Sequence, residues 1–94
     1  MRRPVRYEEI SREGLTYYKL VVKRGFLGRY VIKIFSGVDK YRLSCDLRLT
    51  TWNEDTFKRW LNERILKKYN IFCANCSFLC DLFGISQHYQ AYFK

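Results

Sequence analysis

Three of the four cysteines in this 94-residue chain fall within nine residues, in the stretch FCANCSFLC (Phe72–Cys80). Cysteine thiolates at a C-x-x-C spacing are zinc ligands, so Cys73, Cys76 and Cys80 form, with the upstream Cys45, a candidate set of four. Oxidation would instead join thiols in pairs, and Cys45 with one of the other three is then the candidate disulfide. A third interpretation makes all four small apolar residues of the core.

The spacing of this stretch favours the third interpretation. The residues at positions 69, 72, 73, 76, 79, 80 and 83 are aromatic, leucine or cysteine, and steps of three and four place them on one face of a helix. Gly84 follows where such a helix would end. Neither glycine nor proline opens the C-x-x-C segment, and a second C-x-x-C is missing. We therefore expect core thiols, with no metal and no cofactor, and keep zinc and a disulfide as alternatives.

Catalytic residues are hard to assemble from this sequence. A cysteine nucleophile needs a base and a setting that favours the thiolate, but the only histidine, His88, lies in a polar tail beside Tyr89. The carboxylates fit turns, strands and helix surfaces and form no paired acid–base site. Gly25 and Gly28 fit a hairpin better than a phosphate-binding loop. The sequence therefore predicts a binding protein and not an enzyme.

The charge of the chain is strongly positive and uneven. Eighteen lysines and arginines against nine acidic residues give +9, and residues 1–50 alone hold twelve basic and five acidic residues. Such a field attracts anions, nucleic acid first and an acidic protein or membrane surface next. No apolar run approaches the ~18 residues of a membrane span, and the basic N-terminus lacks the apolar region of a secretory signal. We expect an intracellular protein with reduced thiols and no membrane association.

Alternating hydropathy predicts the sheet on which these charges lie. Residues 16–24, 29–35 and 40–50 alternate apolar with polar side chains, which indicates three antiparallel strands within residues 16–50. Short links at 24–28 and 36–39 suit hairpins. Residues 1–14 are expected to form a basic N-terminal arm.

Helical spacing predicts the second layer. Thr51 and Glu54 form a capping box, and an apolar stripe continues to Tyr69, so the main helix is expected over residues 51–70, with Trp60 and Leu61 buried mid-stripe. Residues 71–94 are expected to hold a shorter helix and the aromatic tail HYQAYF. The predicted fold is α+β, a three-stranded antiparallel meander with the main helix across one face, in a single domain.

Strand parity gives an expected register. Pairing the apolar faces places Lys19 opposite Lys33 and Lys33 opposite Arg42, a row of three cations on the outer face of the sheet. Like charges directly opposite each other cost roughly 0.2–1 kcal/mol per pair, so an anionic partner is the expected occupant of this face. The expected nucleic-acid-binding residues are Lys19, Lys23, Arg29, Lys33, Lys40 and Arg42, the aromatic residues Tyr17 and Phe35, and the arm residues Arg2, Arg3 and Arg6.

The order strand–strand–strand–helix over residues 16–69 resembles that of small DNA-binding domains that lay a three-stranded sheet in the major groove, such as the plant AP2 domain. It is also similar to the order in double-stranded-RNA-binding domains. The likeness is one of element order, and neither family's residue motifs occur here. It implies that this architecture can bind DNA or RNA.

Two functional hypotheses follow. The first is a small basic nucleic-acid-binding protein that uses the outer face of its sheet. The second is a protein–protein interaction or inhibitor module, acting on an acidic or nucleic-acid-handling partner or forming a homodimer through a sheet edge. Compact basic accessory proteins of viruses fit either.

Overall fold

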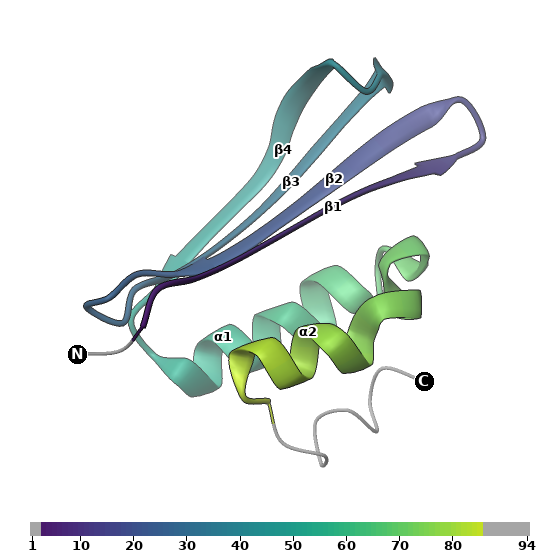
Figure 1. Ribbon diagram of the computed structural model, residues 1–94. Helices are drawn as coiled ribbons and strands as arrows, with labels where there is room; N and C mark the ends of the chain where they lie inside the picture. The colour runs from purple at the N-terminus through teal and green to yellow at the C-terminus, as the bar shows by residue number, and fades with distance from the viewer. Residues whose placement is uncertain (1–2, 86–94) are drawn as a thin grey trace.

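The computed structural model describes residues 3–85, apart from the side chain of Cys73. Four antiparallel strands form one sheet in the order β1-β2-β3-β4, and helical segments cover one of its faces (Figure 1). The strands are β1 (Val5–Glu13), β2 (Thr16–Arg24), β3 (Tyr30–Asp39) and β4 (Arg42–Thr51). The α+β class is confirmed, but the expected three strands are four.

The additional strand is β1, which the sequence analysis assigned to a basic arm. Its inward positions pass from Val5 and Tyr7 to Glu9 and Ser11, so the strand lacks the apolar alternation of its neighbours. The turn to β2 holds two residues, with Gly14 first at φ 62°. Two-residue hairpin turns need a positive φ there, which glycine adopts freely. Gly14, which lies between two segments rich in charged and β-branched residues, was the sequence signal that could have predicted this hairpin.

The core lies between the sheet and the helical layer. Leu20 and Val22 from β2 and Ile32 and Ile34 from β3 are almost fully buried there. Tyr7 extends this face onto β1, where its hydroxyl donates to the Glu9 carboxylate. Neighbouring apolar side chains of β4 are only partly buried. The apolar face predicted for β2 and β3 is therefore confirmed, and β1 enlarges it.

The predicted register was wrong at both hairpins. Arg24 pairs with Tyr30 across the five-residue loop 25–29, so the loop length was right and its position off by one residue. At the next hairpin Asp39 pairs with Arg42, which leaves Lys40 and Tyr41 as the turn in place of residues 36–39. In a strand without a bulge, parity fixes which face a side chain occupies but not the row in which it lies.

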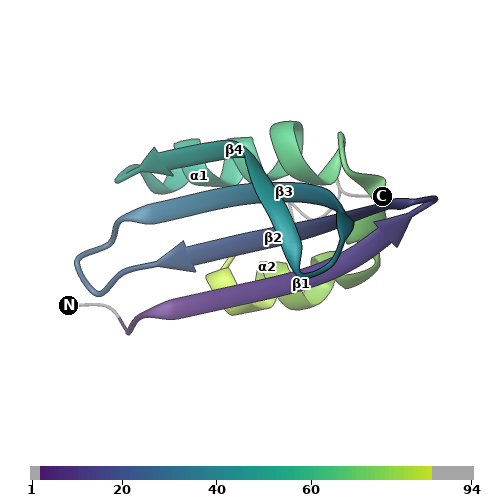
Figure 2. The ribbon, with the colours of Figure 1, turned by 90° about the horizontal axis from the view of Figure 1, so that it is seen from above.

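A bulge and a close backbone approach bend β4. Ile34 pairs with Leu47 but Phe35 pairs with Cys45, so Asp46 is an extra residue on β4. Gly37 then lies so close to β4 that a Cβ there would be 2.5 Å from the carbonyl oxygen of Arg42. Extra residues increase strand bending and twist. As a result, the β3–β4 hairpin rises away from the helices and passes over the outer side of the sheet (Figures 1 and 2).

The main helix begins later than predicted. α1 (Glu54–Trp60) has Asn53 as its N-cap, and the Asn53 side chain accepts from the Thr56 amide at 2.8 Å. Thr51 ends β4, so the predicted capping box is wrong. The helix continues as the π-helical η1 (Leu61–Leu66). Its wider turns bury Leu61, Ile65 and Leu66, while Trp60 is only partly buried, contrary to expectation.

A 3-10 segment and a second helix complete the layer. These are η2 (Asn70–Asn75) and α2 (Cys76–Phe83), and α2 ends at Gly84 with φ 67°, as predicted. Asn75 links this layer to β1, because its side-chain amide donates to Glu9 at 2.9 Å. His88 and the aromatic tail lie outside the described residues.

Candidate nucleic-acid interface

The outer face of the sheet, turned away from the helices, carries a cluster of five cations. Arg6 lies opposite Lys23 in one row, and Lys33 lies opposite Arg48 in the next. Arg29 joins them from the end of the 25–29 loop. We call Arg6, Lys23, Arg29, Lys33 and Arg48 the basic cluster; together they come from all four strands and one loop.

The members of the basic cluster repel one another. The pKa of Lys23 lies below its ordinary value, chiefly because the charge of Lys33 disfavours a further cation, with desolvation and the other three cluster members adding to the effect. Among residues 3–85, ion pairs with a carboxylate are formed by Arg6 but by none of Lys23, Arg29, Lys33 and Arg48. The cluster therefore has a large uncompensated positive charge.

One carboxylate borders the cluster. Glu8 forms ion pairs with Lys19 at 3.1 Å and with Arg6 at 3.0 Å, and the hydrogen bonds from Lys19 and then Arg6 lower the pKa of its carboxyl group. One partner is on β1, the strand of Glu8 itself, and the other is on β2. Glu8 thus compensates one flank of the face and leaves the β3–β4 flank, with Lys33 and Arg48, positive.

Aliphatic side chains form the floor beneath the cluster. Val21 and Val31 point to the outer face, yet only 3% and 7% of their surfaces are exposed. Lysine and arginine stems cover apolar surface while their charged ends reach water, which accounts for this burial. A shallow hollow of about 280 Å³ remains, lined by Lys23, Gly25, Arg29, Val31 and Arg48.

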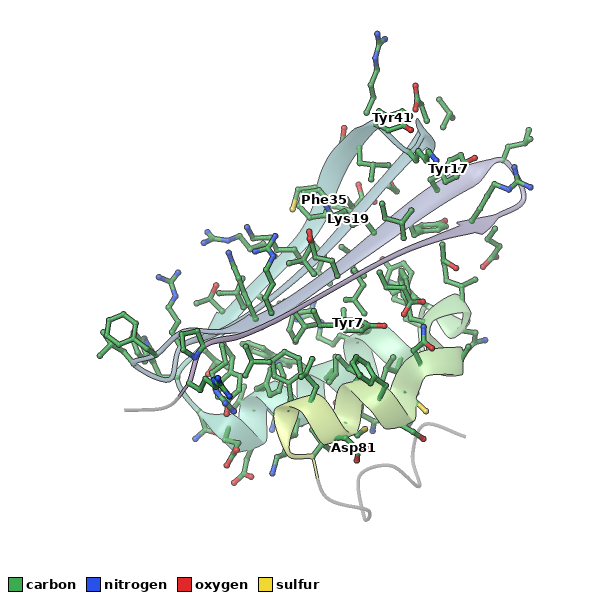
Figure 3. The ribbon with its side chains drawn as sticks, in the orientation of Figure 1. Tyr7, Tyr17, Lys19, Phe35, Tyr41 and Asp81 are labelled. Atoms are coloured by element: carbon green, nitrogen blue, oxygen red, sulfur yellow. The ribbon has the colours of Figure 1, made fainter. Side chains whose placement is uncertain are left out.

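Aromatic side chains occupy the other half of the same face. The next row holds Lys19, Phe35 and Cys45, and the row beyond it holds Tyr17. Figure 3 shows Phe35 and Lys19 close together on the side away from the helices, with Tyr17 nearer the hairpin ends. The ammonium of Lys19 lies 5.8 Å from the Phe35 ring centre, a cation–π distance.

Some of the predicted site residues lie in or beside the basic cluster, and others lie away from it. Lys23, Arg29, Lys33 and Arg6 meet in the basic cluster, and Lys19, Tyr17 and Phe35 lie beside it. The row Lys19–Lys33–Arg42 does not form, because Lys19 faces Phe35 and Lys33 faces Arg48. Lys40 and Arg42 lie instead at the far β3–β4 turn, where the Lys40 ammonium is 5.3 Å from the Tyr41 ring.

The arm residues and Arg48 also depart from expectation. Arg3 is exposed before β1, where its carbonyl accepts from Arg24 at 3.3 Å, and Arg2 lies outside the described residues. Arg48 is the cluster member that the sequence analysis missed. Its alternating position on the polar face of β4 was visible, but only the true register brings it opposite Lys33.

The cysteines lie on both sides of the sheet. Cys45 is exposed on the outer face, because the bulge at Asp46 reverses the facing of β4 there, so the expectation that it points to the core is wrong. Cys80 is fully buried in the core, and desolvation raises its pKa to about 12. Cys76 is partly buried, and the Cys73 side chain lies outside the description.

The sheet lies between Cys45 and Cys80. Cys45 therefore cannot join Cys80 in the alternative zinc site or in a disulfide. Cys45, Cys76 and Cys80 are free thiols. Within residues 3–85, side chains of His, Cys, Asp and Glu form no group of three able to hold a metal ion.

Neither a family model, nor a curated protein, nor a solved structure matches this chain. The chemistry of the site therefore rests on its own geometry. In the part of the chain that the structure describes, no helix is long and apolar enough to cross a membrane. The outer face offers fixed positive charge, an apolar floor and aromatic rings, which is the chemistry used elsewhere to contact anions that carry planar or apolar groups.

Proposed function

We propose that this protein binds nucleic acid inside the cell through the outer face of its sheet, as a binding protein and not as an enzyme. The observation that carries the proposal is the basic cluster. Lys23, Arg29, Lys33 and Arg48 converge on one face, and within residues 3–85 none of these four forms an ion pair with a carboxylate.

The cluster is costly to the fold on its own. Lys33 and Arg48 are directly opposite each other, and a like-charge pair in that position destabilises a sheet by roughly 0.2–1 kcal/mol. Phosphate groups would remove that repulsion, and the counterions that they release would add to the binding free energy. Nucleic acid supplies phosphates at a spacing that several cluster members can contact together.

A second candidate is a protein-interaction module, with an acidic partner or a second copy of the chain. The observation that favours it is a pair of exposed apolar side chains, Phe26 and Leu27, of which 52% and 66% of the surface is accessible. They lie at the tip of the 25–29 loop, beside the hollow. Exposed apolar groups next to a charged patch are common at protein interfaces.

Fluorescence anisotropy with labelled duplex DNA, single-stranded DNA and duplex RNA over a salt series tests the proposal. Affinity should fall steeply with salt, with ~0.9 added to the slope of log K against log salt for each phosphate contact on duplex DNA and ~0.7 on single strands. Lys33→Gln should reduce the magnitude of that slope by the value of about one phosphate contact. Lys68→Gln, an exposed lysine of the helical layer, is the matched control and should not change it.

The outcomes separate the two candidates. Salt-dependent binding that Lys33→Gln weakens and Lys68→Gln leaves intact supports the proposal. Binding that is equal in the parent and Lys33→Gln at every salt concentration places the site elsewhere. A parent protein that binds none of the three probes overturns the proposal and leaves the interaction module.

A further inference from the structure

The aromatic half of the outer face contains the ring of Phe35 one row away from the basic cluster. Phe35 and Lys33 are two residues apart on β3 and point to the same side, so about 7 Å separates them along the strand. Phe35 is half-buried: part of its ring is accessible, and within residues 3–85 no helix packs on this face.

Tyr17 adds a second ring on this face. It lies opposite Gly37, whose missing side chain leaves the Tyr17 ring without a cross-strand neighbour on β3. The guanidinium of Arg12 is 5.9 Å from the Tyr17 ring centre, as Lys19 is 5.8 Å from that of Phe35. Each ring thus has a cation over it, and the two rings occupy successive rows.

Aromatic rings and cations on one face favour a single-stranded nucleic acid as the ligand. Base faces are stacked on one another inside a duplex and cannot reach a protein's aromatic rings, whereas the bases of a single strand are free to stack on them. Proteins contact a duplex mostly at its phosphates and groove edges, and most of those contacts are hydrogen bonds that need no ring to stack on.

The shape of the sheet agrees with a flexible ligand. The β3–β4 hairpin rises over the outer side of the sheet (Figures 1 and 2), at the end of the face where Tyr17 lies (Figure 3). Duplex DNA is stiff over ~50 nm and bends at a cost. A single strand can instead follow the curved face from the basic cluster to the rings.

We propose that the outer face binds single-stranded nucleic acid, with the phosphates on the basic cluster and a base stacked on Phe35, and with Tyr17 as a second stacking position. This inference rests on the proposed function, because it assumes that the ligand of the cluster is nucleic acid. It adds the strandedness of the ligand and the residues that contact its bases.

The test compares three probes of equal length by anisotropy: a mixed-sequence single strand, an abasic strand with the same phosphates, and the duplex. At the same salt concentration, the parent should bind the mixed-sequence strand about 10-fold more tightly than the abasic strand, the effect of roughly one base–aromatic stack. The mixed-sequence strand should also outcompete the duplex.

Variants then assign the effect to the ring. Phe35→Leu should remove most of the preference for the mixed-sequence strand over the abasic strand, leaving only the part that Tyr17 contributes, and should leave the abasic affinity unchanged. Phe35→Trp, which keeps a ring, should retain the preference. Phe78→Leu removes an exposed ring from the helical layer and should have no effect.

Failure of this inference is distinguishable from failure of the proposed function. If the parent binds the abasic strand and the mixed-sequence strand equally, or prefers the duplex, the stacking proposal is overturned while phosphate binding stands. If the parent binds none of the three probes, both are overturned. The probe comparison uses the parent alone, so it holds even if Phe35→Leu does not fold.

Discussion

Replacing Lys33 with methionine should stabilise the protein. Lys33 lies directly opposite Arg48, and its charge is the main cause of the lowered pKa of Lys23. Methionine keeps an unbranched side chain of similar length over the apolar floor formed by Val21 and Val31. The substitution therefore removes the charge and conserves most of the packing.

The expected gain follows from the sheet geometry. One directly opposed like-charge pair costs roughly 0.2–1 kcal/mol, so Lys33→Met should raise the free energy of unfolding by about 0.5 kcal/mol. For a domain of this size that corresponds to ~2–4 °C in Tm. The gain should be present in ~10 mM salt, where the Debye length is ~30 Å, and nearly absent at ~1 M, where it is ~3 Å.

Urea unfolding followed by circular dichroism at the two salt concentrations measures this gain. Lys68→Met on the helical layer is the control. Its change in the free energy of unfolding should not show the same gain in low salt. A Lys33→Met protein that is less stable than the parent in low salt, or equally stabilised in both salts, would refute the reasoning that the cluster stores electrostatic repulsion.

Further predictions concern the thiols, one glycine and the pH dependence of stability. Maleimide at pH 8 should label the exposed Cys45 in the folded protein and Cys80 only after unfolding, because burial raises the pKa of Cys80 to about 12; equal labelling rates by mass spectrometry would contradict this. Gly37→Ala should cost about 1–3 kcal/mol, because its Cβ would lie 2.5 Å from a backbone oxygen, whereas Gly25→Ala has open space and should be nearly neutral in the same urea titrations. Because the pKa of Lys23 is lowered in the folded protein, its cationic form destabilises the fold, and this cost is lost as pH rises toward 10.5. The stability advantage of Lys23→Met over the parent protein should therefore shrink between neutral pH and 10.5. An advantage that grows with pH would contradict this prediction.

The sequence predicted side-chain facing better than side-chain position. Alternation correctly assigned Leu20, Ile32 and their neighbours to the core, because burial of one face imposes a period of two. The row in which a residue lies depends on loop position and bulges, which hydropathy does not encode. The facing itself was predicted wrongly where β4 has its bulge, because the extra residue Asp46 turns Cys45 from the core side to the outer side.

The edge position of β1 explains why the sequence did not predict this strand. β1 has only one neighbouring strand and carries polar Glu9 and Ser11 on its inward side, where Glu9 is held by Tyr7 and Asn75. Those hydrogen bonds form only in the folded protein, so the segment resembles a charged arm in sequence. For the candidate site, charge composition predicted a basic outer face, and the register determined that Arg48 and not Arg42 belongs to its centre.

That difference provides the most direct test of the central claim, because Arg48 and Arg42 are exposed arginines on the same strand. The measurement is the affinity of Arg48→Gln and Arg42→Gln for a single-stranded oligonucleotide over a salt series. The basic cluster predicts that Arg48→Gln weakens binding and lowers the salt slope by ~0.7, the value of one phosphate contact on a single strand, while Arg42→Gln stays close to the parent. A larger loss in Arg42→Gln than in Arg48→Gln would contradict the proposed interface.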